Sequence, residues 1–213
     1  MIKKILVLIG LVFLYISAFC QNKQDTLFLF MPKCHVDSLI DSYLGQYNPI
    51  YTDSLQKNLI NSVHGEFGKL FVIIDYPLET EEYNRFFNIY LNLTQDNKPA
   101  NKFNFFDFDS IFKSKQLRKT IILYAEGFRK SKKIYDKETA KSILTAVLSL
   151  GTYVKLTFKY HTNIFFTIYD HYDKKVLYKK RKMSDEIDPI LTKDIEKQIH
   201  YMYLEYLKIP EKK

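Results

Sequence analysis

The chain is poor in cysteine and lacks the short motifs that mark many enzymes. It has two cysteines and no tryptophan among 213 residues. It has no glycine-rich phosphate loop, no Gly-x-Ser-x-Gly elbow, no His-Glu-x-x-His and no Cys-x-x-Cys pair. The usual sequence grounds for assigning a nucleotide-binding enzyme, an α/β-hydrolase or a zinc protease are therefore absent.

The first twenty residues have the pattern of a secretory signal peptide. Lys3 and Lys4 give a positive start, and residues 5–19 form an apolar or small-residue run of fifteen. As a helix this run spans roughly 22 Å, less than a bilayer core of about 30 Å. We expect residues 1–20 to be a signal peptide cleaved after Cys20, and residues 21–213 to form a single exported domain.

Two alternatives for this segment stay open. It could be retained as an anchor, or Cys20 could be lipidated, since residues 16–20 resemble a lipobox in which the bulky Phe19 replaces the usual small residue. Cleavage after Cys20 leaves Cys34 alone, so no internal disulfide can form and a hydrophobic core must hold the domain. The expected location is the periplasm or outer membrane of a Gram-negative bacterium, with no membrane span after cleavage.

The charge balance is basic. The net charge of +8 becomes +6 without Lys3 and Lys4, with 30 basic against 24 acidic residues. Export favours an envelope protein or an anionic envelope surface as the partner over nucleic acid. We predict a solvent-facing docking surface on the basic residues of segment 153–182: Lys155, Lys159, Lys179, Lys180 and Arg181.

Apolar periodicity predicts a mixed α/β domain. Its sheet has helices on both faces, a C-terminal antiparallel meander and a closing helix. The expected strands are 26–31, 70–74 (central in the sheet), 120–124, 154–160, 164–170 and 176–180. The expected helices are 36–44, one capped by Thr52 or Asp53, 79–93, 136–151 and one starting at Asp188 and Pro189.

The alternation in residues 154–160 predicts a strand with one wet face. Val154, Leu156 and Phe158 should face the closing helix. The facing residues of that helix should be Leu191, Ile195 and Ile199.

No histidine or cysteine stands in a catalytic or metal-binding pattern. Cys34 and His35 are adjacent on a strand, so their side chains point to opposite faces. His161 and His171 lie roughly 23 Å apart along an extended chain. We therefore predict no catalytic residue, no cofactor and no metal ligand.

The order of elements in the second half resembles a known family. The strand 120–124 with Glu126-Gly127-Phe128, a helix ending at Leu150-Gly151, and strands 164–170 and 176–178 resemble small exported α/β modules of the curli-secretion lipoprotein type and uncharacterised secreted relatives. The resemblance implies a non-enzymatic α/β module. The lipidated cysteine and pore-forming insertions of that family are not evident here, so it does not imply a pore.

Two functional hypotheses follow. The first is an exported, non-catalytic domain that binds a protein or an envelope component. The alternative is a secreted hydrolase whose site is assembled from residues distant in sequence. A deep pocket with converging titratable groups would favour the enzyme, and a shallow surface with an apolar or basic patch would favour the binder.

Overall fold

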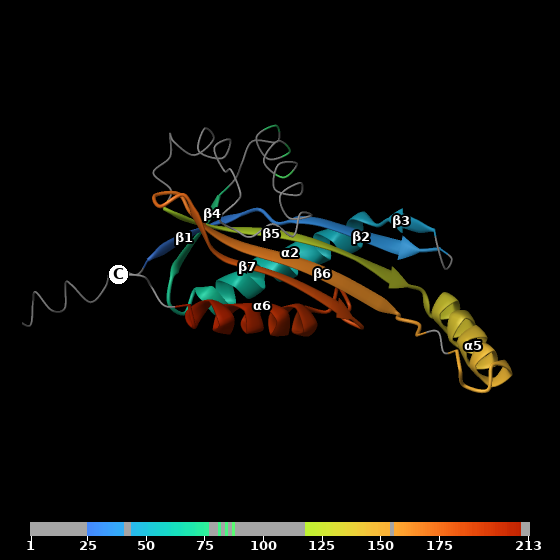
Figure 1. Ribbon diagram of the computed structural model, residues 1–213. Coiled ribbons are helices and arrows are strands. Elements are labelled where there is room, and N and C mark those ends of the chain that lie inside the picture. Colours follow the sequence, from blue (N-terminus) through green and yellow to red (C-terminus); the bar gives the residue numbers. More distant parts are fainter. Residues whose placement is uncertain are drawn as a thin grey trace, which may run out of the picture.

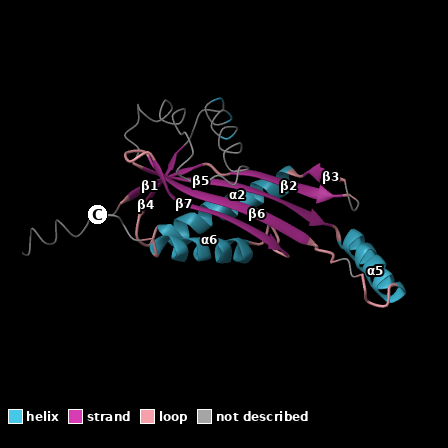
Figure 2. Ribbon diagram, viewed as in Figure 1, coloured by secondary structure: helices cyan, strands magenta, loops and turns pink. Residues whose placement is uncertain are grey.

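A single mixed sheet runs along the molecule in the computed structural model (Figures 1 and 2), which describes residues 25–40, 44–76, 81, 84, 87, 118–153 and 156–209. Within these residues the strands are β1 (Thr26–Phe30), β2 (Lys33–Leu39), β3 (Gly45–Tyr47), β4 (Val72–Tyr76), β5 (Lys119–Lys130), β6 (Tyr160–Asp170) and β7 (Lys175–Asp185). The long helices are α2 (Pro49–Phe67), α5 (Lys132–Leu148) and α6 (Thr192–Leu207).

Strand β5 organises the sheet because it pairs along both of its edges. On one edge β1 and then β2 lie end to end, both parallel to β5, and β6 runs antiparallel along the other edge. Pro32 separates β1 from β2, as expected of a residue with no amide hydrogen for the ladder. Parallel β4 extends the sheet beyond β1, antiparallel β3 beyond β2, and antiparallel β7 beyond β6.

Helices α2 and α6 pack together against one face of the sheet. Phe67 of α2 stacks on Phe166 of β6 with 5.3 Å between ring centroids, and meets Tyr203 of α6 edge-on at 5.0 Å. Ile195 and Ile199 of α6 are fully buried in the same cluster. This cluster is the main hydrophobic core.

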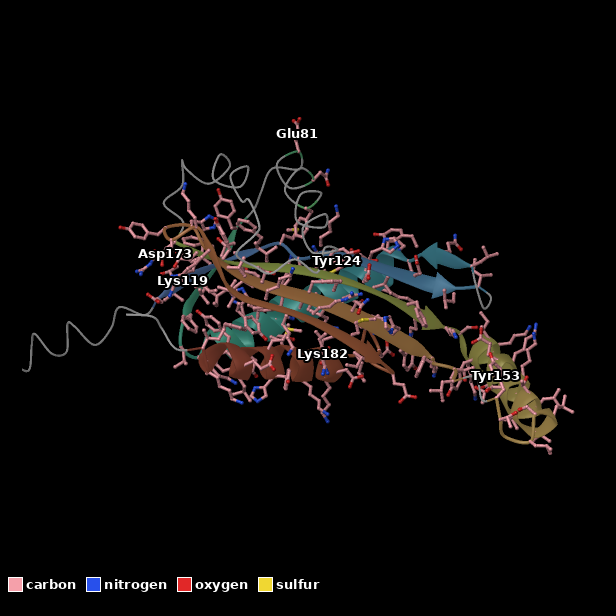
Figure 3. All side chains as sticks on the ribbon, in the orientation of Figure 1. Glu81, Lys119, Tyr124, Tyr153, Asp173 and Lys182 are labelled. Carbon is pink, nitrogen blue, oxygen red and sulfur yellow. The ribbon has the colours of Figure 1, made fainter. Side chains whose placement is uncertain are left out.

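The opposite face of the sheet is also covered. Residues 81, 84 and 87 are helical, and the buried Phe87 lies under the Lys33 ammonium, 5.7 Å from the ring centroid. Lys33 alternates with Cys34, which packs against the α2–α6 core, so it lies on the other face. Figure 3 shows Glu81 on the side away from α6. The predicted α/β fold with a mixed sheet is confirmed.

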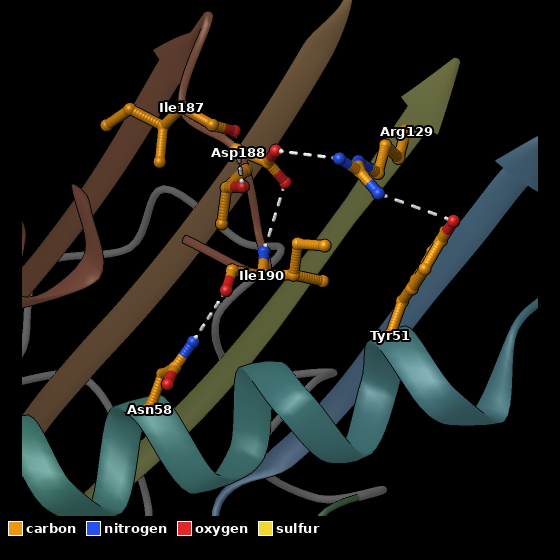
Figure 4. Close-up of polar contacts among 7 residues, drawn as sticks. Tyr51, Asn58, Arg129, Ile187, Asp188 and Ile190 are labelled. Atoms are coloured by element: carbon orange, nitrogen blue, oxygen red, sulfur yellow. Dashed lines mark hydrogen bonds and ion pairs between the residues drawn. The ribbon is translucent and has the colours of Figure 1, made fainter. Parts of the chain in front are cut away.

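The segment before α6 is tied to three elements (Figure 4). Asp188 accepts a hydrogen bond from the Ile190 amide at 3.2 Å and pairs with Arg129 of β5. Asn58 of α2 donates to the Ile190 carbonyl, and Thr162 of β6 donates to the Ile187 carbonyl. Asp188 therefore caps a turn rather than α6, which begins at Thr192, three residues after the predicted first helical residue Pro189.

Three predictions about elements in the first half of the chain are wrong. Residues 70–74 do not form a central strand: β4 is at an edge of the sheet formed by the described residues. The helix predicted at 36–44 is absent from its described part, since β2 continues to Leu39 in register with β5. Thr52 and Asp53 do not cap α2, which begins at Pro49 behind the cap Asn48.

The strand predicted at 154–160 is also wrong, since 156–159 lie outside any strand and β6 begins at Tyr160. Leu156 is 73% exposed and Leu191 is 51% exposed, so neither belongs to the core. The prediction that Ile195 and Ile199 lie on the buried side of the closing helix is confirmed, since both belong to the same core cluster as Ile164, Phe166 and Ile168 of β6. Residue 154 and the signal segment lie outside the described residues, as does most of the predicted helix 79–93.

Candidate functional site

A shallow basic recess lies where β2 and β5 end and α5 begins. Its volume is about 250 Å³. The parallel pairing of β2 with β5 aligns the last residues of both strands at this edge, with Leu39 opposite Lys130. The lining residues, which we call the basic recess, are Ser38, Leu39, Tyr51, Arg129, Lys130, Ser131, Lys132 and Lys159.

Arg129 is held in the recess by a hydrogen bond, an ion pair and two aromatic rings. One guanidinium nitrogen donates to the Tyr51 hydroxyl at 3.4 Å and another lies 3.4 Å from the Asp188 carboxylate. The guanidinium also lies over the rings of Tyr51 and Tyr160, at 5.3 and 5.5 Å. Partial burial alone lowers the pKa of Arg129, but the Tyr51 hydroxyl and Asp188 outweigh it, so the pKa is raised and the charge is fixed.

Lys130 and Ser131 fix the start of α5. The Lys130 ammonium pairs with the Glu138 carboxylate, and both side chains are almost fully buried. The Ser131 hydroxyl caps the helix by accepting a hydrogen bond from the Ile134 amide at 3.4 Å. Strand, cap and ion pair together set the direction in which α5 leaves the sheet.

The remaining cations give the recess its excess positive charge. Asp188 compensates Arg129 and Glu138 compensates Lys130. Among the described residues no carboxylate forms an ion pair with Lys132 or Lys159, although Lys159 lies over the Tyr160 ring at 5.0 Å. Two cations and the hydroxyls of Ser38, Tyr51 and Ser131 are therefore available to a ligand.

These groups suit an anion better than they suit catalysis. Arginine, lysine and hydroxyl donors bind phosphate and carboxylate oxygens. The described residues of the lining include no carboxylate and no histidine, so they offer no ordinary general base. In the described part of the chain, no three His, Cys, Asp or Glu side chains are grouped as a metal site would require.

The predicted docking residues that the structure describes lie on different surfaces. Lys159 lines the basic recess, and Lys155 lies outside the described residues. Lys180 points toward α6, where its ammonium lies 3.1 Å from the Glu205 carboxylate.

Lys179 and Arg181 project from the other face of β7. Burial lowers the pKa of Lys179, whereas Arg181 is exposed and lies over the Phe165 ring at 4.9 Å. The sequence interpretation missed Arg129, Lys130 and Lys132. The available signal was the run of cations where strand β5 passes directly into a helix.

Neither Cys34 nor any histidine is among the described residues that line the recess. Burial raises the pKa of the Cys34 thiol, which packs against the core, while His35 stacks on Tyr47 and pairs with Asp37 at 3.2 Å. His161 and His171 lie at opposite ends of β6, as predicted. They form no pair with each other.

The comparisons with known proteins give two remote structural likenesses. The chain matches no protein-family model, and no curated protein matches it in sequence. A crystal structure from Helicobacter pylori, named as a homolog of the neuraminyllactose-binding hemagglutinin, aligns with a TM-score of 0.37 and 9% identity, over 90% of this chain and 86% of that one. A Xanthomonas campestris protein of family DUF330 aligns with a TM-score of 0.36 and 7% identity, over 84% and 80% of the two chains.

At these values neither likeness informs the ligand or the location of this chain. Neither of the two is a curli-secretion lipoprotein, and that resemblance stays a prediction. Within the described residues, no helix combines the length and the apolar character needed to cross a bilayer.

Proposed function

We propose that the chain is an exported, non-catalytic domain that binds phosphate-bearing envelope lipids through its basic recess. The observation that carries the proposal is the set of two cations, Lys132 and Lys159, that pair with no carboxylate of the described residues and lie beside a fixed guanidinium at one end of the sheet. Export rests on the positively charged, apolar N-terminal pattern and is part of the proposal.

The hydrolase alternative has less support. The recess holds about 250 Å³, below the usual range of roughly 300–1,000 Å³ for small-molecule pockets. Among the described residues, its titratable lining groups are Tyr51 and cations, without a carboxylate or imidazole to accept a proton. A hydrolase site would need such groups to converge there.

The first test is binding to vesicles of phosphatidylcholine with and without phosphatidylglycerol, at low salt. A basic residue near an anionic surface contributes about 1 kcal/mol. Lys132→Gln with Lys159→Gln should therefore weaken binding roughly thirtyfold. Lys179→Gln with Arg181→Gln is the matched control, because it removes the same charge from β7, and it should weaken binding less.

Equal losses from both double variants would move docking toward the β7 surface. Purified lipopolysaccharide as a competitor distinguishes the two lipid sources of phosphate. Failure of wild-type protein to bind either lipid would overturn the proposal.

A further inference from the structure

The far end of α5 carries large apolar side chains that the protein does not bury. Leu148 is 76% exposed and Leu150 is 92% exposed. Ile143, Leu144, Val147 and Tyr153 are exposed as well. We call the exposed apolar residues 143–153 the α5 tip, and Figure 1 shows α5 projecting beyond the end of the sheet.

The tip lies far from the opposite pole of the molecule. Figure 3 labels Tyr153, which belongs to the tip, and shows Lys119 and Asp173 at the other end of the sheet. The buried side of α5 is formed instead by Glu138 and Ser142, which are polar. Burial of α5 therefore does not account for its apolar residues.

Charge and apolar character are separated along the axis of α5. Up to residue 141, its outward side carries Lys133, Lys137 and Lys141 with a single acid, Asp136, and all four are exposed. Beyond Lys141, the exposed side chains of the helix are apolar except for Thr145. A helix that docks in a protein groove shows an apolar stripe along its length. In α5 the exposed apolar residues are instead concentrated at the C-terminal end, and the three lysines, which we call the basic collar, precede them.

The turn that ends α5 holds Leu150 outward in a costly conformation. Leu150 has φ of 50° and Gly151 has φ of 78°. The Gly151 amide donates to the Ala146 carbonyl at 2.8 Å, which closes the helix end. A bulky residue at positive φ is uncommon. Leu150 is therefore a strained residue, and among the described residues it is the most exposed large apolar side chain.

We propose that the α5 tip inserts into the interface of an anionic phospholipid bilayer. This inference rests on the proposed function and names the source of its phosphate as a phospholipid membrane. The positive charges of the basic collar are attracted to the negative headgroups, and the apolar side chains of the tip are buried at the acyl boundary beneath them.

The dimensions agree with shallow insertion. From Lys141 to Leu148 the helix rises roughly 10 Å. Interfacial helices bury their apolar parts about 5–10 Å into the headgroup and acyl boundary. With the leucines at that depth, Lys141 lies at the level of the headgroups.

The absence of tryptophan from the chain permits a direct test of insertion. Leu148→Trp places a single indole on the tip, and Tyr172→Trp places one on an exposed position of the β6–β7 turn, at the opposite end of the sheet. With phosphatidylglycerol-containing vesicles, the Leu148→Trp emission should shift to the blue and be quenched by brominated lipid. The Tyr172→Trp emission should not change.

A second variant separates insertion from charge attraction. Leu148→Ser with Leu150→Asn removes the apolar tip, and asparagine tolerates the positive φ of residue 150, so folding should be preserved. Vesicle partitioning at high salt should fall at least about tenfold, while low-salt binding through the basic recess persists. Leu204→Ser with Leu207→Ser, at exposed apolar positions of α6 outside the basic recess, is the matched control for removal of exposed apolar residues and should leave partitioning unchanged.

Two results would overturn the inference. Vesicle binding without an emission shift in Leu148→Trp would leave the proposed function standing and remove insertion. A wild-type dimer in sedimentation analysis that the tip variant converts to monomer, without vesicle insertion, would assign the tip to a second copy of the chain. If the wild-type protein binds no anionic lipid at all, the proposed function itself is wrong.

Discussion

The α2–α6 side of the sheet and the projecting α5 use the same residue types to opposite effect. In the packed region, Leu55, Leu59, Val63 and Phe67 of α2 recur on one face, and all are fully buried against the sheet and α6. In α5, leucine, isoleucine and valine recur at similar spacing and stay exposed. Apolar periodicity therefore indicates a helix, and the partner decides whether the helix is core.

The two helices differ in burial because different surfaces lie opposite them. Helix α2 faces β2 and α6, which supply a continuous apolar surface. Helix α5 starts at the end of β5, and its inward residues Glu138 and Ser142 meet polar groups such as Lys130. We infer that the packed region provides stability and that the α5 end provides an interaction surface.

The largest expected effect is on the packed core. Phe67→Ala removes a fully buried ring between Phe166 and Tyr203, and should lower the free energy of unfolding by about 3–5 kcal/mol. Leu148→Ala should change it by no more than about 0.5 kcal/mol, because exposed positions rarely contribute more. Urea unfolding followed by circular dichroism measures both.

If Phe67→Ala does not fold, Phe67→Leu provides a milder change, with an expected cost of about 1–2 kcal/mol. A large cost for Leu148→Ala would show that the α5 tip is packed in solution. The comparison between the two regions would then fail.

A smaller effect is expected at the joint between the regions. Glu138→Gln leaves the Lys130 ammonium almost fully buried without its carboxylate partner. A hydrogen bond to a charged group contributes about 1.5–3 kcal/mol, and we expect a loss in that range. Because the pair connects β5 to α5, amide exchange should speed up in α5 more than in α2, as measured by exchange mass spectrometry.

Asp136→Asn on the outward side of α5 is the control for this change. It removes one acid without a buried partner and should leave exchange in α5 nearly as in wild type. Uniform acceleration across α2 and α5 in Glu138→Gln would instead show that the two regions unfold as one unit.

Much of the fold follows from local patterns, and the errors have physical causes. Continuous apolar runs identified β1 and β5, and the spacing of Ile195 and Ile199 identified the buried side of α6. The run at 70–74 predicted a central strand because its residues are apolar on both faces. Sheet order depends on pairing between distant strands, and β4 pairs with β1 alone among the described strands.

The same limit applies to the site. Lys159 was predicted as a docking residue, but its neighbours in the recess come from β2, β5 and the start of α5. Tyr51 and Arg129 are 78 residues apart in the chain and are joined by a hydrogen bond. No local periodicity encodes such a contact, so a recess built from four segments could not be found from the sequence.

The smallest expected effect concerns pH and again separates the two regions. Glu66 at the end of α2 accepts hydrogen bonds from His200 of α6 and from Lys69, each at 2.8 Å. Partial burial alone raises the pKa of Glu66, but these bonds outweigh it and the pKa is lowered. Folding therefore favours the carboxylate form, so its contribution is present above the unfolded pKa of about 4.3 and is lost as pH falls through the lower folded pKa. Because this contact is near the surface, the contribution should be no more than about 0.5 kcal/mol.

Glu66→Gln should lower the free energy of unfolding slightly at pH 7 and not at pH 3, whereas Glu196→Gln, an exposed acid on α6, should show no such difference. A deficit for Glu66→Gln that persists at pH 3 would indicate lost packing between α2 and α6 rather than lost charge.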